Sequence, residues 1–309
     1  MAKFIFTIAT FFLITTAGHA QLASIQERLG YPADTKLLII HADDIGVSHS
    51  ENIASIHAME NGSVNSGSMM VPCPWFPEIA AYAAEHPESD FGLHLTITSE
   101  WKYFKWGPIS PITEVPGLLT DFNHFYRSRK DVKSNATAEE IEKELRSQIE
   151  LALKYGIDIT HLDSHMFTLY LKAEYLEVYK KLGREYKLPI LLNAEYLTLF
   201  GLDADKHINE DIVVDKVYMA YSPDYEQGMA NYYTESIQSM QPGLNIILLH
   251  AAYNNEEMRG VTSNHPGYGA EWRQQDFNFF TSDACKKVVA EENIQLITWR
   301  EIKDKLIGD

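Results

Sequence analysis

The stretch KLLIIHADDIGVS, residues 36–48, constrains the fold of this chain more than any other. Leu37 to Ile40 form an all-apolar run, which is typical of a strand buried on both faces of a sheet. Asp43 and Asp44 follow the run, at the end where parallel α/β folds carry their chemistry. Because neighbouring carboxylates repel each other, a metal ion, a proton or a basic residue has to neutralise one of them. A turn closed by Gly46 is the alternative interpretation.

Strand and helix patterns alternate along the chain and favour an α/β fold. Short apolar runs predict strands, and 3.6-residue periods between them predict helices. The expected strands are 37–40, 64–71, 91–97, 157–162, 188–192, 212–217, 244–249 and 294–297, and the expected helices are 48–62, 76–85, 138–155, 173–186 and 224–240. This alternation predicts a parallel sheet or barrel. No repeat, low-complexity segment or linker interrupts it, so we expect a single domain over residues 21–309.

The first twenty residues have the pattern of a secretory signal peptide. Lys3 precedes the apolar run Phe4 to Thr16, and small residues lead up to Ala20 before a polar segment. The run is too short for a membrane span, so we expect an exported, periplasmic or secreted protein with no integral membrane segment after cleavage. The formal charge of −17 disfavours nucleic acid and anionic membranes as partners. The sequence does not indicate an oligomeric state.

Polar side chains also lie at or near the ends of three other predicted strands. His94 lies in the second half of one strand, the group 161–165 follows another, and His250 ends a third. Each could be a buried structural histidine, but a common rim would bring them together with Asp43 and Asp44. One carboxylate and two imidazoles suit Zn²⁺, Mn²⁺, Ni²⁺ or Fe²⁺. The second carboxylate would then be available as a general base on a water molecule.

The segment 98–137 is rich in aromatic residues and shows no regular period. Such a loop after an active-site strand often shapes a substrate pocket, and Trp101 and Trp106 could stack on sugar rings. Packing of the aromatics against one another is an equally good interpretation. Later in the chain, Arg273 could orient a sugar hydroxyl or acetyl oxygen, or it could form a surface ion pair with Asp276.

Four short motifs, HADDIGVS, SMMVPCPW, DFGLHLT and THLDSH, occur in an order and spacing that resemble the YdjC-like carbohydrate deacetylase family, which includes chitooligosaccharide deacetylases. The resemblance runs from about Lys36 to near the C-terminus. It implies an irregular, TIM-like (β/α) barrel and a divalent metal ion, with Mg²⁺ or Zn²⁺ expected first. Residue by residue, it implies Asp44, His94 and His165 as metal ligands, Asp43 as general base and His250 as general acid.

The chain departs from the family pattern at two of these positions. His165 is followed by Met166 and Phe167 rather than by further histidines, so His161 stays open as the second histidine ligand. His250 is followed by two alanines, and the only His-Pro-Gly begins at His265, which is therefore a rival for the acid. Cys73 and Cys285 form no metal-binding motif, and we expect two buried free thiols.

The expected activity is removal of acetyl groups from N-acetylated sugars or oligosaccharides by metal-activated water. The same site could hydrolyse an O-acetyl or phosphate ester, because activated water serves all three reactions. A carbohydrate-binding protein without turnover is the alternative from another class. In each case the expected partner is a carbohydrate or another neutral or cationic small molecule.

Overall fold

The computed structural model describes residues 23–209, 211–265 and 267–308, and the expected signal peptide at 1–20 lies outside them. Within these ranges no helix is long and apolar enough to cross a membrane. The strands are β1 (Lys36–Ile45), β2 (Ser66–Met69), β3 (Phe91–Leu95), β4 (Leu162–Ser164), β5 (Lys216–Met219), β6 (Gly243–Leu249) and β7 (Gln295–Leu296).

All the strand pairings in the sheet are parallel, in the order β4-β3-β2-β1-β6-β5, and β7 pairs with the start of β1. The gap between β4 and β5 is bridged irregularly. Ile190 forms an isolated bridge with Leu162, and the Val214 amide donates to the Leu192 carbonyl at 2.8 Å. The sheet therefore curls into an irregular (β/α) barrel, which confirms the predicted fold class.

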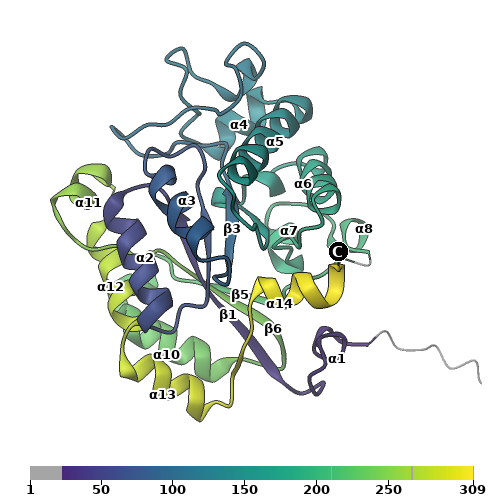
Figure 1. Cartoon of the computed structure of the whole chain (residues 1–309), viewed down its shortest axis with the longest axis vertical. Helices are drawn as coiled ribbons and strands as arrows, with labels where there is room; N and C mark the ends of the chain where they lie inside the picture. The colour runs from purple at the N-terminus through teal and green to yellow at the C-terminus, as the bar shows by residue number, and fades with distance from the viewer. Residues whose placement is uncertain (1–22, 210, 266, 309) are drawn as a thin grey trace, which may run out of the picture.

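Helices cover the outside of the curled sheet (Figure 1). α2 (His49–Asn61), α10 (Met229–Ser239), α12 (Ala270–Phe280) and α13 (Asp283–Glu291) gather on one side, and α4 (Arg129–Asn135), α5 (Ala138–Lys154), α6 (Ala173–Glu185) and α7 (Ala194–Leu199) on the other. The remaining α-helices are α1 (Ile25–Leu29), α3 (Phe76–Glu85), α8 (Ala204–His207), α9 (Ser222–Gln227), α11 (Glu256–Val261) and α14 (Trp299–Ile302). The short 3-10 helices are η1 (Pro116–Leu118) and η2 (His165–Tyr170), and η3 (Lys303–Ile307) is a π-helical turn.

Local sequence signals explain where the best-predicted helices begin. The capping box of α5 is present, because the Glu140 amide donates to Thr137 Oγ1 and the Thr137 amide donates to the Glu140 carboxylate. Ser48 is the N-cap of α2, where its hydroxyl accepts from the Glu51 amide at 3.1 Å. This cap holds Glu51 in the first turn of α2, next to the end of β1.

Several expected elements differ from the observed ones. The predicted helix 224–240 is two helices, because Gly228 has a φ of 107° that an α-helix does not accommodate. The predicted strand 157–162 is β4, which starts only at Leu162, where the paired register with β3 begins. The strand expected at 188–192 is reduced to the bridge at Ile190, and the strand expected at 212–217 runs over 216–219.

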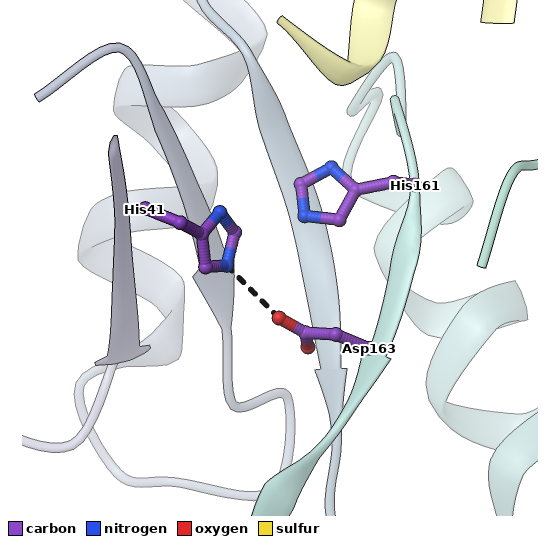
Figure 2. Close-up of side chains that lie close together, drawn as sticks. All are labelled: His41, His161 and Asp163. Carbon is purple, nitrogen blue, oxygen red and sulfur yellow. Dashed lines mark hydrogen bonds and ion pairs between the residues drawn. The ribbon is translucent and has the colours of Figure 1, made fainter. Parts of the chain in front are cut away.

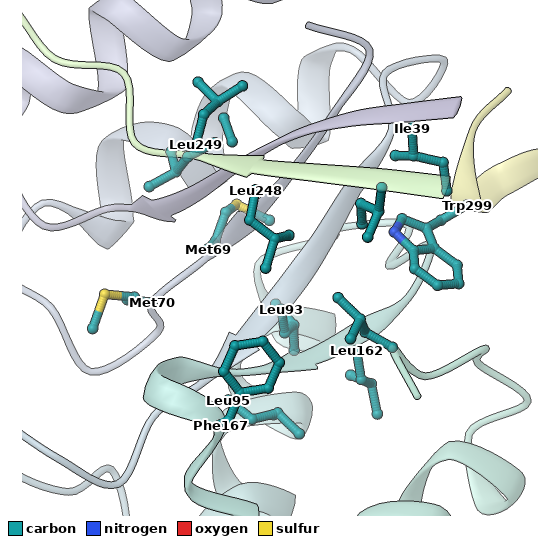
Figure 3. Close-up of a cluster of buried hydrophobic side chains, with 14 of the residues drawn as sticks. Ile39, Met69, Met70, Leu93, Leu95, Leu162, Phe167, Leu248, Leu249 and Trp299 are labelled. Carbon is teal, nitrogen blue, oxygen red and sulfur yellow. The ribbon is translucent and has the colours of Figure 1, made fainter. Parts of the chain in front are cut away.

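The core fills the curl of the sheet beneath the strand ends. Figure 3 shows Ile39, Leu93, Leu162, Leu248 and Trp299 gathered among the strands, and all five are buried. Burying each such aliphatic side chain contributes roughly 1.5–3 kcal/mol, so this layer is a firm base for the polar residues above it. Both cysteines are buried and unpaired within the described chain, as predicted.

Candidate active site

The end of β1 projects two buried carboxylates into a cavity of about 430 Å³. The pairing of β1 with β2 shifts register between Ala42 and Ile45, so Asp43 and Asp44 occupy a bulge. Asp44 has a φ of 61°, in the left-handed region that costs a non-glycine residue free energy. The bulge leaves both side chains lining the cavity, although neighbours on a regular strand point to opposite faces.

Asp44, His94 and His165 form the group at the centre of this cavity. Asp44 Oδ1 lies 3.2 Å from His165 Nδ1 and 3.5 Å from His94 Nε2. The ligand atoms of the three residues lie within 4.8 Å of one another. Asp44 Oδ1 is buried and has no hydrogen-bond partner among the described residues. A carboxylate oxygen that is left free between two imidazole nitrogens fits a divalent metal ion.

Each of these two histidines is held by a carboxylate at its other ring nitrogen. Asp163 Oδ1 lies 2.7 Å from His94 Nδ1, and Glu100 Oε2 lies 3.0 Å from His165 Nε2. Such partners fix the ring orientation and the tautomer of a metal-binding histidine. Neither Asp163 nor Glu100 is among the predicted site residues. Asp163 falls within the THLDSH motif, whereas Glu100 lies in an irregular loop that gives no signal.

The structure distinguishes His161 from His165. His165 starts η2, in which Met166 and Phe167 both have positive φ, and its ring faces Asp44. His161 lies deeper, where its ring stacks on Trp299 at 5.2 Å and its Nδ1 lies 2.9 Å from Thr160 Oγ1. Of the two, only His165 belongs to the group with Asp44 and His94.

Arg273 is buried beside Asp44 rather than exposed on the surface. It donates to Asp44 Oδ2 at 2.7 Å and to the buried Glu51 carboxylate, and its Nε donates to the Tyr268 carbonyl. Burial alone would raise the pKa of Asp44, but Arg273, with the nearby His165 and His250, holds it well below its ordinary value of 3.8. The expected alternative, a surface ion pair of Arg273 with Asp276, does not form.

His250 and His265 both line the cavity but have different polar contacts. His250 Nε2 lies 3.8 Å from Asp44 Oδ2, and its amide donates to Asp276 at 3.0 Å. Burial lowers the pKa of His250 to about 4, so its ring is neutral near pH 7 in the free protein. His265 instead directs Nδ1 to the Gly267 carbonyl.

A large part of the cavity wall is apolar and aromatic. Phe167 stacks on Tyr196 with ring centroids 4.3 Å apart, and the other members of this wall are Leu199, Phe200, Met219, Tyr221 and Tyr268. Several of them come from 193–221, a region with weak sequence patterns. An apolar wall facing a few polar groups is typical of a pocket for a small organic ligand, and the C–H faces of a sugar ring fit it.

The two predicted substrate-binding tryptophans are placed differently. Trp101 lines the cavity, and the Arg273 guanidinium lies 5.3 Å from its ring centroid. Trp106 lies behind Trp101, with ring centroids 5.7 Å apart, and donates from Nε1 to the Thr98 carbonyl. Trp106 does not line the cavity, because the aromatic loop packs partly against itself.

Known proteins of one family match this chain over most of its length. The model of the family described as YdjC-like protein matches residues 37–291. A carbohydrate deacetylase of Brevibacillus brevis is 27% identical over 265 residues, covering 86% of this chain and 99% of the relative. A carbohydrate deacetylase of Thermus thermophilus is 28% identical over 289 residues, covering 91% and 98%.

A solved structure shares the fold. The crystal structure of a protein from Enterococcus faecalis, described as a candidate cellobiose-phosphate cleavage protein, superposes with a TM-score of 0.70 at 23% sequence identity. The match covers 87% of this chain and 99% of that one. The likeness therefore shows that the two proteins share their overall fold.

Proposed function

This chain belongs to the YdjC-like protein family, and we propose that it is a metal-dependent hydrolase that removes acetyl groups from N-acetylated sugars or oligosaccharides. The observation that carries the proposal is the group of Asp44, His94 and His165, with its buried and unpartnered Asp44 Oδ1. These three residues would hold a divalent ion, Mg²⁺ or Zn²⁺. When bound, the ion supplies Lewis-acid chemistry, acidifying water and polarising a carbonyl.

Asp43 is the proposed general base. Its carboxylate lines the cavity beside the group, and Oδ1 is buried without a hydrogen-bond partner among the described residues. Oδ1 lies 3.1 Å from His41 Nε2 without forming a hydrogen bond of good geometry, so the carboxylate can still take a proton from a water molecule that attacks the acetamide carbon. Asp44 cannot share this role, because Arg273 occupies Oδ2 and the two histidines face Oδ1.

His250 is the proposed general acid. The carbon–nitrogen bond of the acetamide breaks as the leaving amine gains a proton, and the products are acetate and a free amino sugar. Because His250 is neutral in the free protein, it has to gain a proton during the reaction before it can donate one. That proton is the one that the attacking water gives up to Asp43. His265 is the alternative acid, and its Nδ1 contact with Gly267 makes it less free to reorient.

Substrate contacts are assigned to the rest of the cavity. Trp101 and the aromatic wall would cover the sugar rings, and Trp106 would support Trp101 from behind. Arg273 is fully engaged by Asp44, Glu51 and Tyr268, so we assign it to holding Asp44 rather than to a sugar hydroxyl.

We also propose that the protein is exported. N-terminal sequencing of the mature protein from the producing cells tests this, and a start at residue 21 is the expected result.

The experiment that tests the function uses a panel of N-acetylated, O-acetylated and phosphorylated oligosaccharides. Acetate and phosphate release are measured with and without a chelator, and binding is measured by calorimetry. Metal-dependent acetate release from N-acetylated substrates supports the proposal. Acetate release only from O-acetyl esters would replace the proposal by an O-acetyl esterase, and phosphate release would replace it by a phosphate ester hydrolase. Binding without turnover would indicate a carbohydrate-binding protein.

A further inference from the structure

His41 lies on β1 just below the catalytic rim, and its side chain is buried in a polar network. Its Nδ1 lies 2.8 Å from Ser66 Oγ, and its Nε2 lies 2.9 Å from Asp163 Oδ2. Figure 2 shows the His41 ring directed at Asp163 from the opposite strand. The same Nε2 lies 3.1 Å from Asp43 Oδ1. One ring nitrogen therefore faces two buried carboxylates.

The two carboxylates have different tasks in the proposed reaction. Asp163 uses Oδ1 to hold His94 at 2.7 Å and receives Ser68 Oγ and His41 on Oδ2. Asp43 is the proposed base, and its Oδ1, which has no hydrogen-bond partner in the described part of the chain, forms an ion pair with His41 Nε2 at 3.1 Å. His41 thus connects the base with the residue that orients a metal ligand, although it contacts neither the cavity nor the ligands themselves.

The position of His41 between the two carboxylates also affects their charge balance. Asp43 and Asp163 are both buried, and two anionic carboxylates this close repel each other strongly unless a positive charge lies between them. Burial alone would lower the pKa of His41, but its contacts with Asp163 and Asp43 raise it to about 10. The ring is therefore an imidazolium near pH 7, and both its nitrogens donate.

We propose that His41 is a positioning residue of this enzyme, whose Nε2–H fixes the Asp43 carboxylate toward the reacting water and the Asp163 carboxylate against His94. The part concerning Asp43 rests on the proposed function, whereas the part concerning His94 rests on the metal site alone. A histidine that only filled the core would also satisfy Ser66, but it would not need Nε2 within reach of both carboxylates.

The variants His41→Leu and His41→Gln distinguish a positioning role of His41 from mere filling of the core. Leucine fills most of the ring volume without donating, whereas the glutamine amide reaches the position of Nε2 and donates one N–H. His161→Phe is the matched control, because His161 is equally buried, its ring centroid lies 5.0 Å from that of His41, and it bonds to neither carboxylate. The measurements are the Zn²⁺ dissociation constant of each metal-free protein by calorimetry, and kcat and KM at saturating metal.

We expect H41L to weaken Zn²⁺ binding by about 10- to 100-fold, as loss of an outer-shell partner does. Its kcat should fall by about the same factor while KM changes less than about twofold. H41Q should recover Zn²⁺ affinity to within about threefold, and H161F should match the wild type in both quantities.

Three results would overturn the proposal. The first is equal Zn²⁺ affinity in H41L and the wild type. The others are equal losses of Zn²⁺ affinity in H41L and H41Q, or the same loss in H161F. If H41L does not fold, H41Q decides, because Zn²⁺ binding more than about tenfold weaker in H41Q contradicts positioning by a donated N–H. A wild type that binds Zn²⁺ but releases no acetate refutes the proposed function only, since the calorimetry still decides the role of His41.

Discussion

The carboxylate of Glu100 lies 3.0 Å from Nε2 of His165, on the opposite side of the ring from the nitrogen that faces Asp44. Glu100 follows β3 by only a few residues, and His165 follows β4, so pairing of these two strands brings the residues together. This contact lets the ring keep its remaining proton on Nε2 when Nδ1 binds a metal ion. The binding group is therefore oriented before any ion arrives.

Replacing Glu100 by glutamine should weaken metal binding without removing a ligand. We expect E100Q to raise the dissociation constant by about 10- to 100-fold, because His165 loses the charge that fixes its tautomer. Calorimetric titration of the metal-free protein measures this. Glu114→Gln is the control, since Glu114 only forms an exposed ion pair with Lys143. Unchanged affinity in both variants would exclude Glu100 from the site.

Replacing Asp43 by asparagine should separate chemistry from metal binding. We expect D43N to lower kcat for acetate release by about 100-fold or more, since asparagine accepts no proton. Metal content should stay at the wild-type level if Asp44, His94 and His165 hold the ion, because Asp43 belongs to a different possible group, with His94 and Asp163. The checks are an acetate assay and elemental analysis of the same preparation. Normal turnover in D43N would remove Asp43 as the base.

Arg273→Met should destabilise the protein strongly. The substitution leaves the buried Asp44 and Glu51 carboxylates without their cation, which costs roughly 3–5 kcal/mol. Urea unfolding of the metal-free protein measures the change in the free energy of unfolding. Arg146→Met, which breaks only partly exposed ion pairs with Glu142 and Glu185, should cost less than about 1 kcal/mol. Similar losses of unfolding free energy in the two variants would show that the buried ion pairs of Arg273 stabilise the protein no more than exposed ones do.

The free energy of unfolding should depend on pH through His41. Its pKa is about 10 in the folded protein and 6.5 ordinarily, so the folded state holds the proton more tightly. The resulting stabilisation is complete below pH 6.5 and is lost as the pH rises toward 10. Metal-free wild type should therefore lose more stability than H41Q between pH 6.5 and 9, as measured by urea unfolding. Parallel pH profiles would indicate that His41 is neutral when folded.

The sequence predicts the barrel well because its strands are short apolar runs and its helices carry clear caps. Leu37 to Ile40 are completely buried, and Thr137 and Ser48 cap α5 and α2. Elements without such signals are predicted less accurately. The bridge at Ile190 depends on tertiary pairing with Leu162, which a local pattern does not contain.

The candidate site divides in the same way. Asp43 and Asp44 lie near the end of β1, His94 lies near the end of β3, and His250 follows β6. The shared rim of a parallel sheet predicts that they meet. Glu100 reaches the site from a loop where no period or motif marks it. Arg273, on α12, is a candidate in the sequence, but its contact with Asp44 is not predicted. The bulge that turns Asp43 and Asp44 to one side arises from pairing with β2 and is equally invisible in one sequence.

One measurement tests the central claim directly: acetate release from N-acetylated chito-oligosaccharide by chelator-treated protein, before and after one equivalent of Zn²⁺ or Mg²⁺ is added. His165→Ala is assayed alongside. We predict no release from the metal-free protein, recovery in the wild type and no recovery in H165A, since the ion then lacks one of its three ligands. Release at the same rate with and without metal, or full recovery in H165A, would contradict the assignment of Asp44, His94 and His165 as the metal site of this deacetylase.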